Sequence, residues 1–382
     1  ILDVLNIHHM DKAYIMIYFF DQVVIGKYSD SVLFIPSEYN ENLFDEKGML
    51  LSPTMLPEID ATAEEIYVSR YVSFYPENAL EGLKIGVYEH SAVGRDILSK
   101  VLQELGAEII SLGRSETFIP VDTEAIREED SRLAREWAKE GFFAIVSTDG
   151  DSDRPLLSDE NGEWLRGDVL GILAATALGI SSVATPVSCN TALEKCNRFK
   201  KICRTRIGSP YVIEGMESLA QDFNSVAGYE ANGGFLLQTD VEKAGKILKA
   251  LPTRDALLPI ISVLVNAKDL KIKVSDLLKE LPSRFSASDR LKNFPTEKSK
   301  QKIAEIKSEN LGEVLFGKFS GKLKAIDETD GFRMTFDSEE IIHLRPSGNA
   351  PELRCYVEAT SQERAKKLLT DCIQVLESFR GE

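Results

Sequence analysis

The chain has 382 residues, of which 43% are hydrophobic and 28% are charged. Its 45 Lys and Arg against 61 Asp and Glu give a formal net charge of −16 at pH 7. This composition is typical of a soluble globular protein with several domains of about 100–200 residues each. Surfaces for nucleic acid or anionic membrane need clustered basic residues, so the acidic excess argues against both as partners. A phosphate ligand would require a local basic site.

The five cysteines include no CxxC pair and are odd in number. They therefore predict neither a disulfide framework nor a zinc site, and they favour a reducing, cytoplasmic location. The first apolar run, Ala13 to Phe20, is far shorter than the ~20 residues of a membrane span. It also lacks the basic flank of a signal peptide, so we expect a buried strand there.

Strands and helices are predicted to alternate regularly from Lys84 onward. We expect strands at 84–90, 107–113 and 142–148, with helices at 94–105 and 124–139. The same alternation predicts strands at 181–188, 201–207 and 226–229, and helices at 192–199, 253–267 and 274–280. Short loops between such elements indicate parallel sheets covered by helices.

The pattern changes at Leu281. Residues 281–297 contain two prolines and little periodicity, which predicts a linker. A charged helix is expected at 296–308, followed by short alternating strands at 322–327, 332–337, 340–345 and 353–359 and an amphipathic helix from Ser361. Grouped strands with helices indicate a small α+β domain.

Three loops carry candidate chemistry. In the first, 149–154 (DGDSDR), Asp149, Asp151 and Asp153 follow an apolar strand at spacings that let three carboxylates converge on one hard cation. Arg154 adds a group that can bind phosphate. A calcium EF-hand loop is the more specific alternative. However, Arg154 occupies the position where that motif needs glycine, and the loop follows a predicted strand instead of a helix.

The second loop is 228–234 (GYEANGG), where Glu230 and Asn232 are two residues apart and suit sugar hydroxyls; a plain turn is the alternative. The third is 343–354 (HLRPSGNAPELR). Here arginines, a hydroxyl and backbone N–H groups could surround a phosphate dianion. The alternative is a rigid connection between strands with exposed arginines.

In this order the loops resemble those of the α-D-phosphohexomutase superfamily, the phosphomannomutases and phosphoglucomutases, and the bacterial phosphomannomutase-like branch is the most similar. The family commonly has DGDGDR in its metal loop, a glutamate two residues before a serine in its sugar loop, and RPSGTEPxxR in its phosphate loop. The resemblance begins at about Glu81 and continues to the C-terminus.

The resemblance implies a multi-domain α/β fold with mixed sheets and a C-terminal α+β lid domain. It divides the chain into 1–79, a shortened or degenerate first domain; 80–163, ending in the metal loop; 164–284, with the sugar loop; and 285–382, with the phosphate loop. It implies an isomerase that transfers a phosphoryl group between the 6- and 1-positions of a hexose phosphate through a phosphoserine. The sequence leaves mannose and glucose phosphates open as substrates.

The resemblance also implies the roles of individual residues. Asp149, Asp151 and Asp153 would bind Mg²⁺, and Arg154 would be a catalytic cation. Glu230 and Asn232 would bind the sugar, with Asn232 replacing the usual serine. The phosphate that is not reacting would be bound by Arg345, Ser347, Gly348, Asn349 and Arg354. Residues 204–211 resemble a family loop that reaches the substrate phosphate, and Arg206 is the candidate there.

The first domain departs from the family pattern. It is shorter than usual, and the serine loops TxSHNP and GSHIP do not occur in it. Residues 32–37 (VLFIPS) are the nearest match, and this alignment places Leu33 at the position of the nucleophile; Ser31 or Ser37 is the alternative. Two hypotheses follow: an active Mg²⁺-dependent phosphohexomutase, or a sugar-phosphate-binding protein without catalysis.

Overall fold

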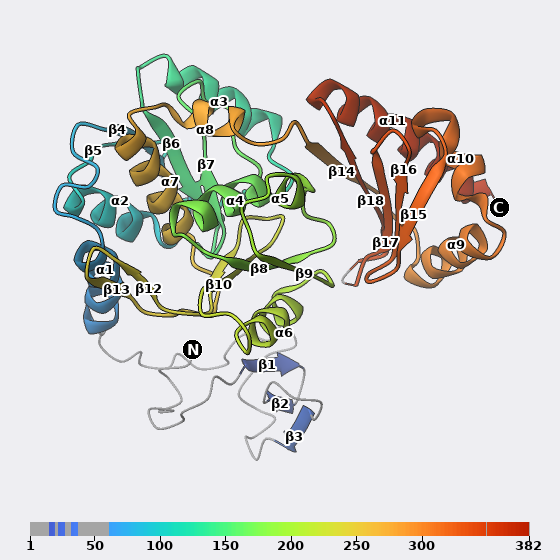
Figure 1. Ribbon diagram of the computed structural model, residues 1–382, viewed down its shortest axis with the longest axis horizontal. Helices are drawn as coiled ribbons and strands as arrows, with labels where there is room; N and C mark the ends of the chain where they lie inside the picture. The colour runs from blue at the N-terminus through green and yellow to red at the C-terminus, as the bar shows by residue number, and fades with distance from the viewer. Residues whose placement is uncertain (1–14, 20–21, 27–31, 37–60, 349, 382) are drawn as a thin grey trace. The chain divides into compact units, whose positions relative to one another are not determined.

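The computed structural model describes residues 61–348 and 350–381, together with the backbone of three strands near the N-terminus (Figure 1). These strands are β1 (Ile15–Phe19), β2 (Gln22–Gly26) and β3 (Val32–Pro36), which form an antiparallel sheet in this order. The chain divides into two compact units, Ile1–Ala61 and Thr62–Glu382. A strand is confirmed within the run from Ala13 to Phe20. Leu33 lies in β3, whose side chains are not described, and Ser31 and Ser37 lie outside the described residues.

The second unit begins with α1 (Ala61–Phe74) and a four-stranded sheet in the order β5-β4-β6-β7. Its strands are β4 (Lys84–Tyr88), β5 (Glu108–Leu112), β6 (Ala144–Thr148) and β7 (Pro155–Leu157), and its helices are α2 (Arg95–Glu104) and α3 (Glu128–Ala138). The first three strands are parallel and β7 is antiparallel. Helix α3 begins later than predicted because the Asp122 carboxylate accepts the N–H groups of Glu124 and Ala125 in a turn.

A second α/β region repeats this arrangement, with the strand order β11-β10-β8-β9. Its strands are β8 (Ser182–Pro186), β9 (Lys201–Thr205), β10 (Val226–Tyr229) and the antiparallel edge strand β11 (Phe235–Leu237). Its helices are α4 (Gly167–Ala177), α5 (Ala192–Lys195), α6 (Ser209–Leu219), α7 (Leu257–Leu270) and α8 (Val274–Lys279), and β12 (Val241–Lys243) pairs with β13 (Lys246–Leu248). Both sheets are mixed, which confirms the predicted fold class.

Asp255 sets the start of α7. Its buried carboxylate accepts the N–H groups of Leu257 and Leu258, which are the first of the helix, so α7 begins after the predicted position. The same carboxylate accepts the hydroxyls of Tyr67 and Tyr71 at 2.9 and 2.6 Å. Helix α1 is therefore tied to the start of α7 within the second unit.

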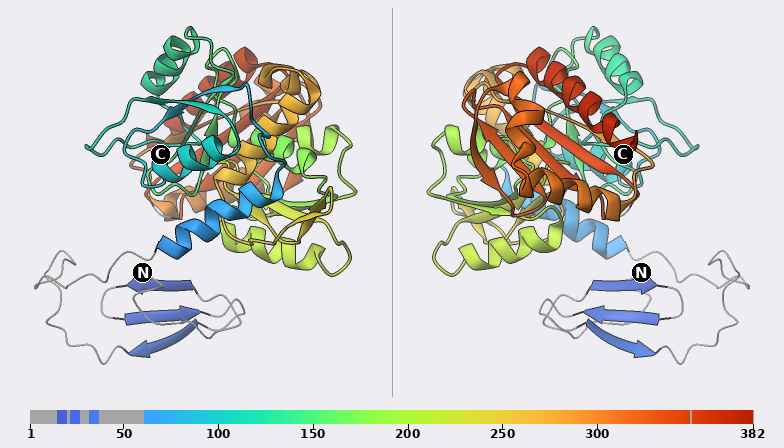
Figure 2. Two further views of the ribbon diagram at one scale, coloured as in Figure 1. Left: turned by 90° about the vertical axis from the view of Figure 1, so that its left-hand side faces the viewer. Right: turned by 90° about the vertical axis from the view of Figure 1, so that its right-hand side faces the viewer.

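The C-terminal region is an antiparallel sheet in the order β14-β18-β17-β16-β15 (Figures 1 and 2). Its elements are β14 (Phe285–Leu291), α9 (Thr296–Ser308), α10 (Leu311–Ser320), β15 (Leu323–Asp327), β16 (Phe332–Phe336), β17 (Ile341–Pro346), β18 (Leu353–Ala359), α11 (Gln362–Ser378) and the short 3₁₀ helix η2 (Phe379–Gly381). Apolar side chains of one sheet face pack with those of the three α-helices in a separate core.

The predicted linker at 281–297 is wrong for residues 285–291. Strand β14 lies within it and pairs with β18 from Phe285↔Ala359 to Leu291↔Leu353. Only Ala287 and Leu291 of this strand contact the core, so its apolar periodicity is too weak to identify it as a strand. In the described part of the chain, no helix is both long and apolar enough to cross a membrane.

Candidate functional site

Three aspartates come together in the turn after β6. Asp149 is buried, Asp151 is exposed and Asp153 is half-buried, and one carboxylate oxygen from each lies within 4.8 Å of the others. Burial, with Asp151 close by, raises the pKa of Asp149 to about 6. Carboxylates held this close together make it unfavourable for all of them to be ionised, and a bound divalent cation would remove that repulsion. All three groups offer oxygen ligands, which hard divalent cations prefer. This part of the site could hold a metal ion.

Ser152 shapes the turn that carries the aspartates. Its φ is +63°, a conformation that favours glycine, and glycine is common at this position in the resembling loops. Its hydroxyl oxygen accepts the N–H of Gly94 at 2.8 Å and lies 3.0 Å from the hydroxyl of Thr148. A Cβ on Gly94 would lie 2.8 Å from that of Ser152, so the start of α2 approaches the turn too closely for another residue. These contacts offset the backbone strain.

Arg154 lies across the same aspartates. Its Nε is 2.5 Å from Oδ2 of Asp149 and 3.4 Å from Oδ1 of Asp153, and its backbone N–H donates to Asp149. The Arg154 side chain is 30% exposed and so is partly open to solvent. Arg154 thus adds a positive charge directly beside the carboxylates.

Glu230 of the second predicted loop is buried directly after β10. Its Oε2 accepts hydrogen bonds from Arg254 Nε at 2.8 Å and from the Ser209 hydroxyl at 2.9 Å. Asn232 is half-buried; its Oδ1 accepts the N–H of Gly234 at 2.9 Å, and its backbone carbonyl accepts the Thr123 hydroxyl. The loop is therefore held at several points, and the amide oxygen of Asn232 is used within it.

Arg254, which was not predicted as a site residue, connects the first two loops. Besides its bond to Glu230, its Nη1 lies 3.0 Å from Oδ2 of Asp153. The guanidinium of Arg254 therefore joins the turn that carries the aspartates to the turn that carries Glu230. One signal was available: Arg254 is basic at the start of the predicted helix 253–267, where positive charge is unfavourable.

The third predicted loop connects β17 and β18. Arg345 and Arg354 lie opposite each other on these strands, and the N–H of Ser347 donates to the carbonyl of Glu352. Ser347 is buried, whereas Gly348 is exposed with open space around its Cα. Asn349 lies outside the described residues. The described part of this loop therefore presents two arginines side by side.

Asp330, which also was not predicted as a site residue, joins this loop to the segment that carries Arg206 and Ile207. Its Oδ2 lies 2.9 Å from Nε of Arg345 and accepts the N–H of Ile207 at 2.9 Å. The Arg206 Nε donates to the carbonyl of Thr329, the residue before Asp330. Arg206 and Arg345 thus both contact the turn that contains Thr329 and Asp330. Ser209, three residues after Arg206, donates a hydrogen bond to Glu230.

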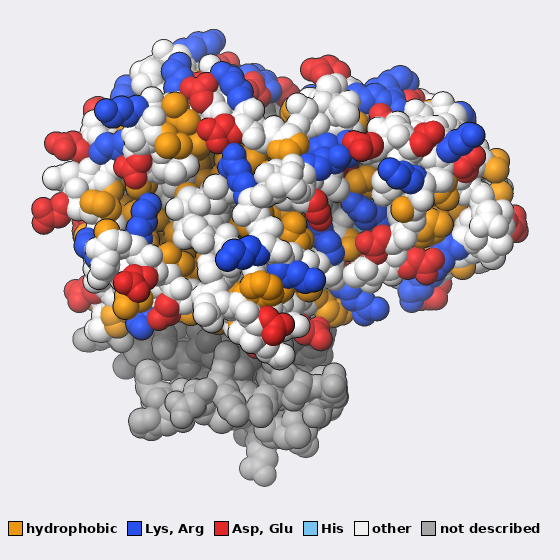
Figure 3. Space-filling model, in the orientation of Figure 1, with side chains coloured by type: hydrophobic (Ala, Val, Ile, Leu, Met, Phe, Trp, Pro, Cys, Tyr) orange, Lys and Arg blue, Asp and Glu red, His pale blue; other side chains and the backbone are white. Residues whose placement is uncertain are grey.

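Two sets of contacts, joined by the short chain segment 207–209, link the aspartate turn to the arginine loop. The first runs from Asp149 through Arg154, Asp153, Arg254 and Glu230 to Ser209, and the second runs from Ile207 through Asp330 to Arg345. Over the coloured part of the face in Figure 3, basic and acidic side chains are intermixed. The arginines of these contacts lie beside carboxylates as well. This agrees with the basic site expected within an acidic chain.

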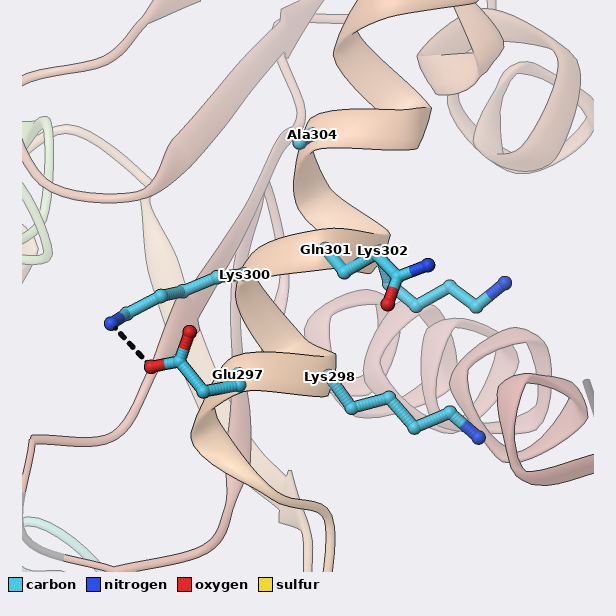
Figure 4. Close-up of a pocket in the computed structure, with 6 residues that line it drawn as sticks. All are labelled: Glu297, Lys298, Lys300, Gln301, Lys302 and Ala304. Atoms are coloured by element: carbon cyan, nitrogen blue, oxygen red, sulfur yellow. Dashed lines mark hydrogen bonds and ion pairs between the residues drawn. The ribbon is translucent and has the colours of Figure 1, made fainter.

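A hollow along α9 is separate from these contacts. It is lined by Glu297, Lys298, Lys300, Gln301, Lys302 and Ala304. Figure 4 shows that these side chains project from a single helix and that Glu297 and Lys300 pair with each other. A surface built from one helix does not enclose a ligand, so we place no site there.

Comparison with protein families identifies three consecutive regions. Residues 65–162 match the phosphoglucomutase/phosphomannomutase alpha/beta/alpha domain II, residues 166–285 match domain III, and residues 270–374 match the C-terminal domain. The chain is 48% identical over 331 residues to a phosphomannomutase of Salmonella muenchen, and 44% identical over 319 residues to one of Sinorhizobium fredii. These alignments include 85% and 83% of the chain and 68% and 67% of the relatives, so the chain spans about two thirds of their length.

Solved structures show the same fold. A phosphoglucomutase/phosphomannomutase family protein from Burkholderia thailandensis has a TM-score of 0.63 at 17% identity, covering 83% of this chain and 65% of that one. An N-acetylphosphoglucosamine mutase of Aspergillus fumigatus, solved with GlcNAc-6P and magnesium, has a TM-score of 0.55 at 16% identity, covering 83% and 66%. With the family matches and the two phosphomannomutases, these findings establish that the chain belongs to the phosphoglucomutase/phosphomannomutase family of phosphohexomutases, which are isomerases.

Proposed function

We propose that this protein interconverts the 6- and 1-phosphates of a hexose, mannose or glucose, with Mg²⁺ bound by Asp149, Asp151 and Asp153. The contacts that link these aspartates to Arg345 through Glu230 and the chain segment 207–209 support this proposal most directly, because they bring a cation site, a sugar site and a phosphate site together. Mg²⁺ would neutralise charge on the phosphoryl group that is transferred. The identity to two phosphomannomutases favours mannose phosphates first.

The side chains of the site would have different roles. Arg154 would stabilise negative charge that develops on the transferred phosphoryl group, because its guanidinium already lies beside the aspartates. Glu230, held by Arg254 and Ser209, would accept hydrogen bonds from sugar hydroxyls through its other oxygen, and Asn232 would donate through its amide nitrogen.

The remaining phosphate of the substrate would be bound by the arginine loop. The residues proposed there are Arg206, Arg345, Ser347, Gly348, Asn349 and Arg354. Guanidinium groups suit this role because they donate two parallel hydrogen bonds to a phosphate and keep their charge. The phosphate that is not reacting would then fix the sugar while the other end approaches the aspartates.

We also propose the domain division 1–79, 80–163, 164–284 and 285–382, in which each of the last three parts contributes one loop. Leu33 at the position of the nucleophilic serine stays a prediction. The second hypothesis, a binding protein without catalysis, is not favoured by the high identity to phosphomannomutases over most of the chain.

A coupled assay tests the proposal. The full chain is given mannose 1-phosphate, Mg²⁺ and a 1,6-bisphosphate activator, and mannose 6-phosphate formation is followed. We expect Asp151→Ala to abolish turnover and Asp222→Ala, a change of another exposed aspartate, to leave it unchanged. Hexose-phosphate binding by the unmodified chain without turnover would contradict the proposal and support the second hypothesis.

A further inference from the structure

Three arginines form a row across the C-terminal sheet. Arg290 of β14 is paired with Arg354 of β18, and Arg354 is paired with Arg345 of β17. Residues directly opposite each other in an antiparallel pair point to the same face, with Cβ atoms about 4.5–5.5 Å apart. The three side chains therefore share one face of the sheet, and Arg290 extends the pair found in the phosphate loop.

This row lies on the sheet face away from the helices. The neighbours Leu291, Leu344 and Leu353 point to the opposite face and pack in the core with α9, α10 and α11. At the other end of β18 the face is closed, because the Glu358 carboxylate binds the N–H and the hydroxyl of Thr191. The space left at that end is only about 10 Å³, enough for one water molecule.

The arginine end of the face is about 13 Å from this closed end, since Arg354 precedes Glu358 by four residues at about 3.3 Å each. The side chains of Arg290, Arg345 and Arg354 keep 38%, 18% and 33% of their surface exposed. A solute can therefore reach all three.

Two carboxylates approach the row, and both do so from the Nε side. Glu352 lies 3.4 Å from Nε of Arg290 and 3.8 Å from Nε of Arg354, and Asp330 lies 2.9 Å from Nε of Arg345. In the described part of the chain, no hydrogen bond from the terminal nitrogens of Arg290 or Arg345 is found, whereas Arg354 also contacts the Tyr356 hydroxyl and lies near Glu124. The guanidinium groups of Arg290 and Arg345 therefore keep their terminal N–H donors for a ligand.

Like charges directly opposite each other on neighbouring strands destabilise a sheet. A row of three arginines therefore lowers stability unless an anion binds to it, and a phosphate dianion has both the charge and the oxygens to accept from several guanidinium groups. We propose that Arg290 is a third phosphate-binding arginine, which contacts the non-reacting phosphate of the hexose phosphate together with Arg345 and Arg354. This inference deepens the proposed function and rests on it.

Calorimetric titration of the full chain with mannose 1-phosphate tests the role of Arg290. We expect Arg290→Gln to weaken binding about tenfold, the effect of one charge-assisted contact at a partly exposed site, and Arg290→Lys to recover part of the loss. Lys324→Gln, which removes a positive charge from β15 of the same sheet, should bind like the unmodified protein. In the coupled assay, Arg290→Gln should raise KM and change kcat little.

The outcomes separate this inference from the proposed function. If the unmodified chain does not bind mannose 1-phosphate, glucose 1-phosphate or inorganic phosphate, the proposed function fails. If it binds and Arg345→Gln weakens binding while Arg290→Gln stays within twofold of the unmodified chain, only the role of Arg290 is wrong. A loss of affinity accompanied by a drop in melting temperature without ligand, with no recovery in Arg290→Lys, would assign Arg290 to folding and overturn the inference.

Discussion

Arg254 offers the most direct test of how the site is held together. Its Nε donates to Glu230 at 2.8 Å, and its Nη1 donates to Asp153 at 3.0 Å. The Glu230 carboxylate is only 4% exposed, so without Arg254 it would keep the Ser209 hydroxyl as its one side-chain partner among the described residues. Arg254→Met preserves the length of the side chain and removes both ionic contacts.

The size of the effect follows from the burial of each pair. A hydrogen bond to a charged, buried carboxylate contributes about 1.5–3 kcal/mol. The pair with Asp153, in which both side chains are about one third exposed, adds less than about 1 kcal/mol. We therefore expect Arg254→Met to lower the free energy of unfolding by about 2–3 kcal/mol, measured by urea denaturation and circular dichroism.

A double-mutant cycle isolates the pair. Arg254→Met combined with Glu230→Gln should be less destabilising than the sum of the single changes, with a coupling of about 2 kcal/mol. Arg132→Met is the matched control, because its partner Glu136 lies on the exposed surface of α3 and such pairs contribute less than about 0.5 kcal/mol. Additive single effects, or a loss for Arg254→Met no larger than that of the control, would refute the role we give Arg254.

Three further predictions concern neighbouring parts of the site. Arg345→Ala should weaken mannose 1-phosphate binding in calorimetry by about 2–3 kcal/mol through lost charge-assisted contacts; an unchanged affinity would remove the loop from the site. Gly167→Ala should lower the melting temperature and impair binding, because its Cβ would lie 2.1 Å from the backbone N of Gly233, whereas Gly317→Ala meets only a flexible side chain and should do neither. Burial lowers the pKa of His343 to about 4, so between pH 6.5 and 4 the unfolded chain takes up a proton that the folded chain does not, and stability falls as the pH decreases. The melting temperature of His343→Gln should therefore fall less over that pH range than the melting temperature of the unmodified protein. An equal fall would contradict this account.

Much of the fold could be predicted from local patterns. The strands β4, β6, β8 and β10 are short apolar runs that end in glycine or polar turns, and such runs identify buried parallel strands without any knowledge of their partners. Helices α1, α4, α6 and α10, the short strands β7 and β11 and the β12–β13 hairpin were not predicted. Strand β14 was mistaken for a linker because most of its side chains are polar and lie away from the helical core.

The candidate loops were likewise recognisable because their residues are close in sequence. Asp149, Asp151 and Asp153 lie in one turn, and the structure does bring them within reach of a common cation. The contacts of Arg254 with Asp153 and of Asp330 with Ile207 could not be predicted, because they join residues 101 and 123 positions apart along the chain. No local spacing reports a contact of that kind.

The length and the charge of the chain can now be related to particular parts of the structure. By itself the sequence determined several α/β domains, an acidic chain with a local basic site, and the three loops, because these properties depend on composition and on residues a few positions apart. Only the tertiary structure decided how the loops are joined and that Arg290 stands beside Arg354 and Arg345. The reason is physical: strand register and contacts between distant segments depend on packing of the whole chain, and packing selects which of the 45 basic residues meet at one point.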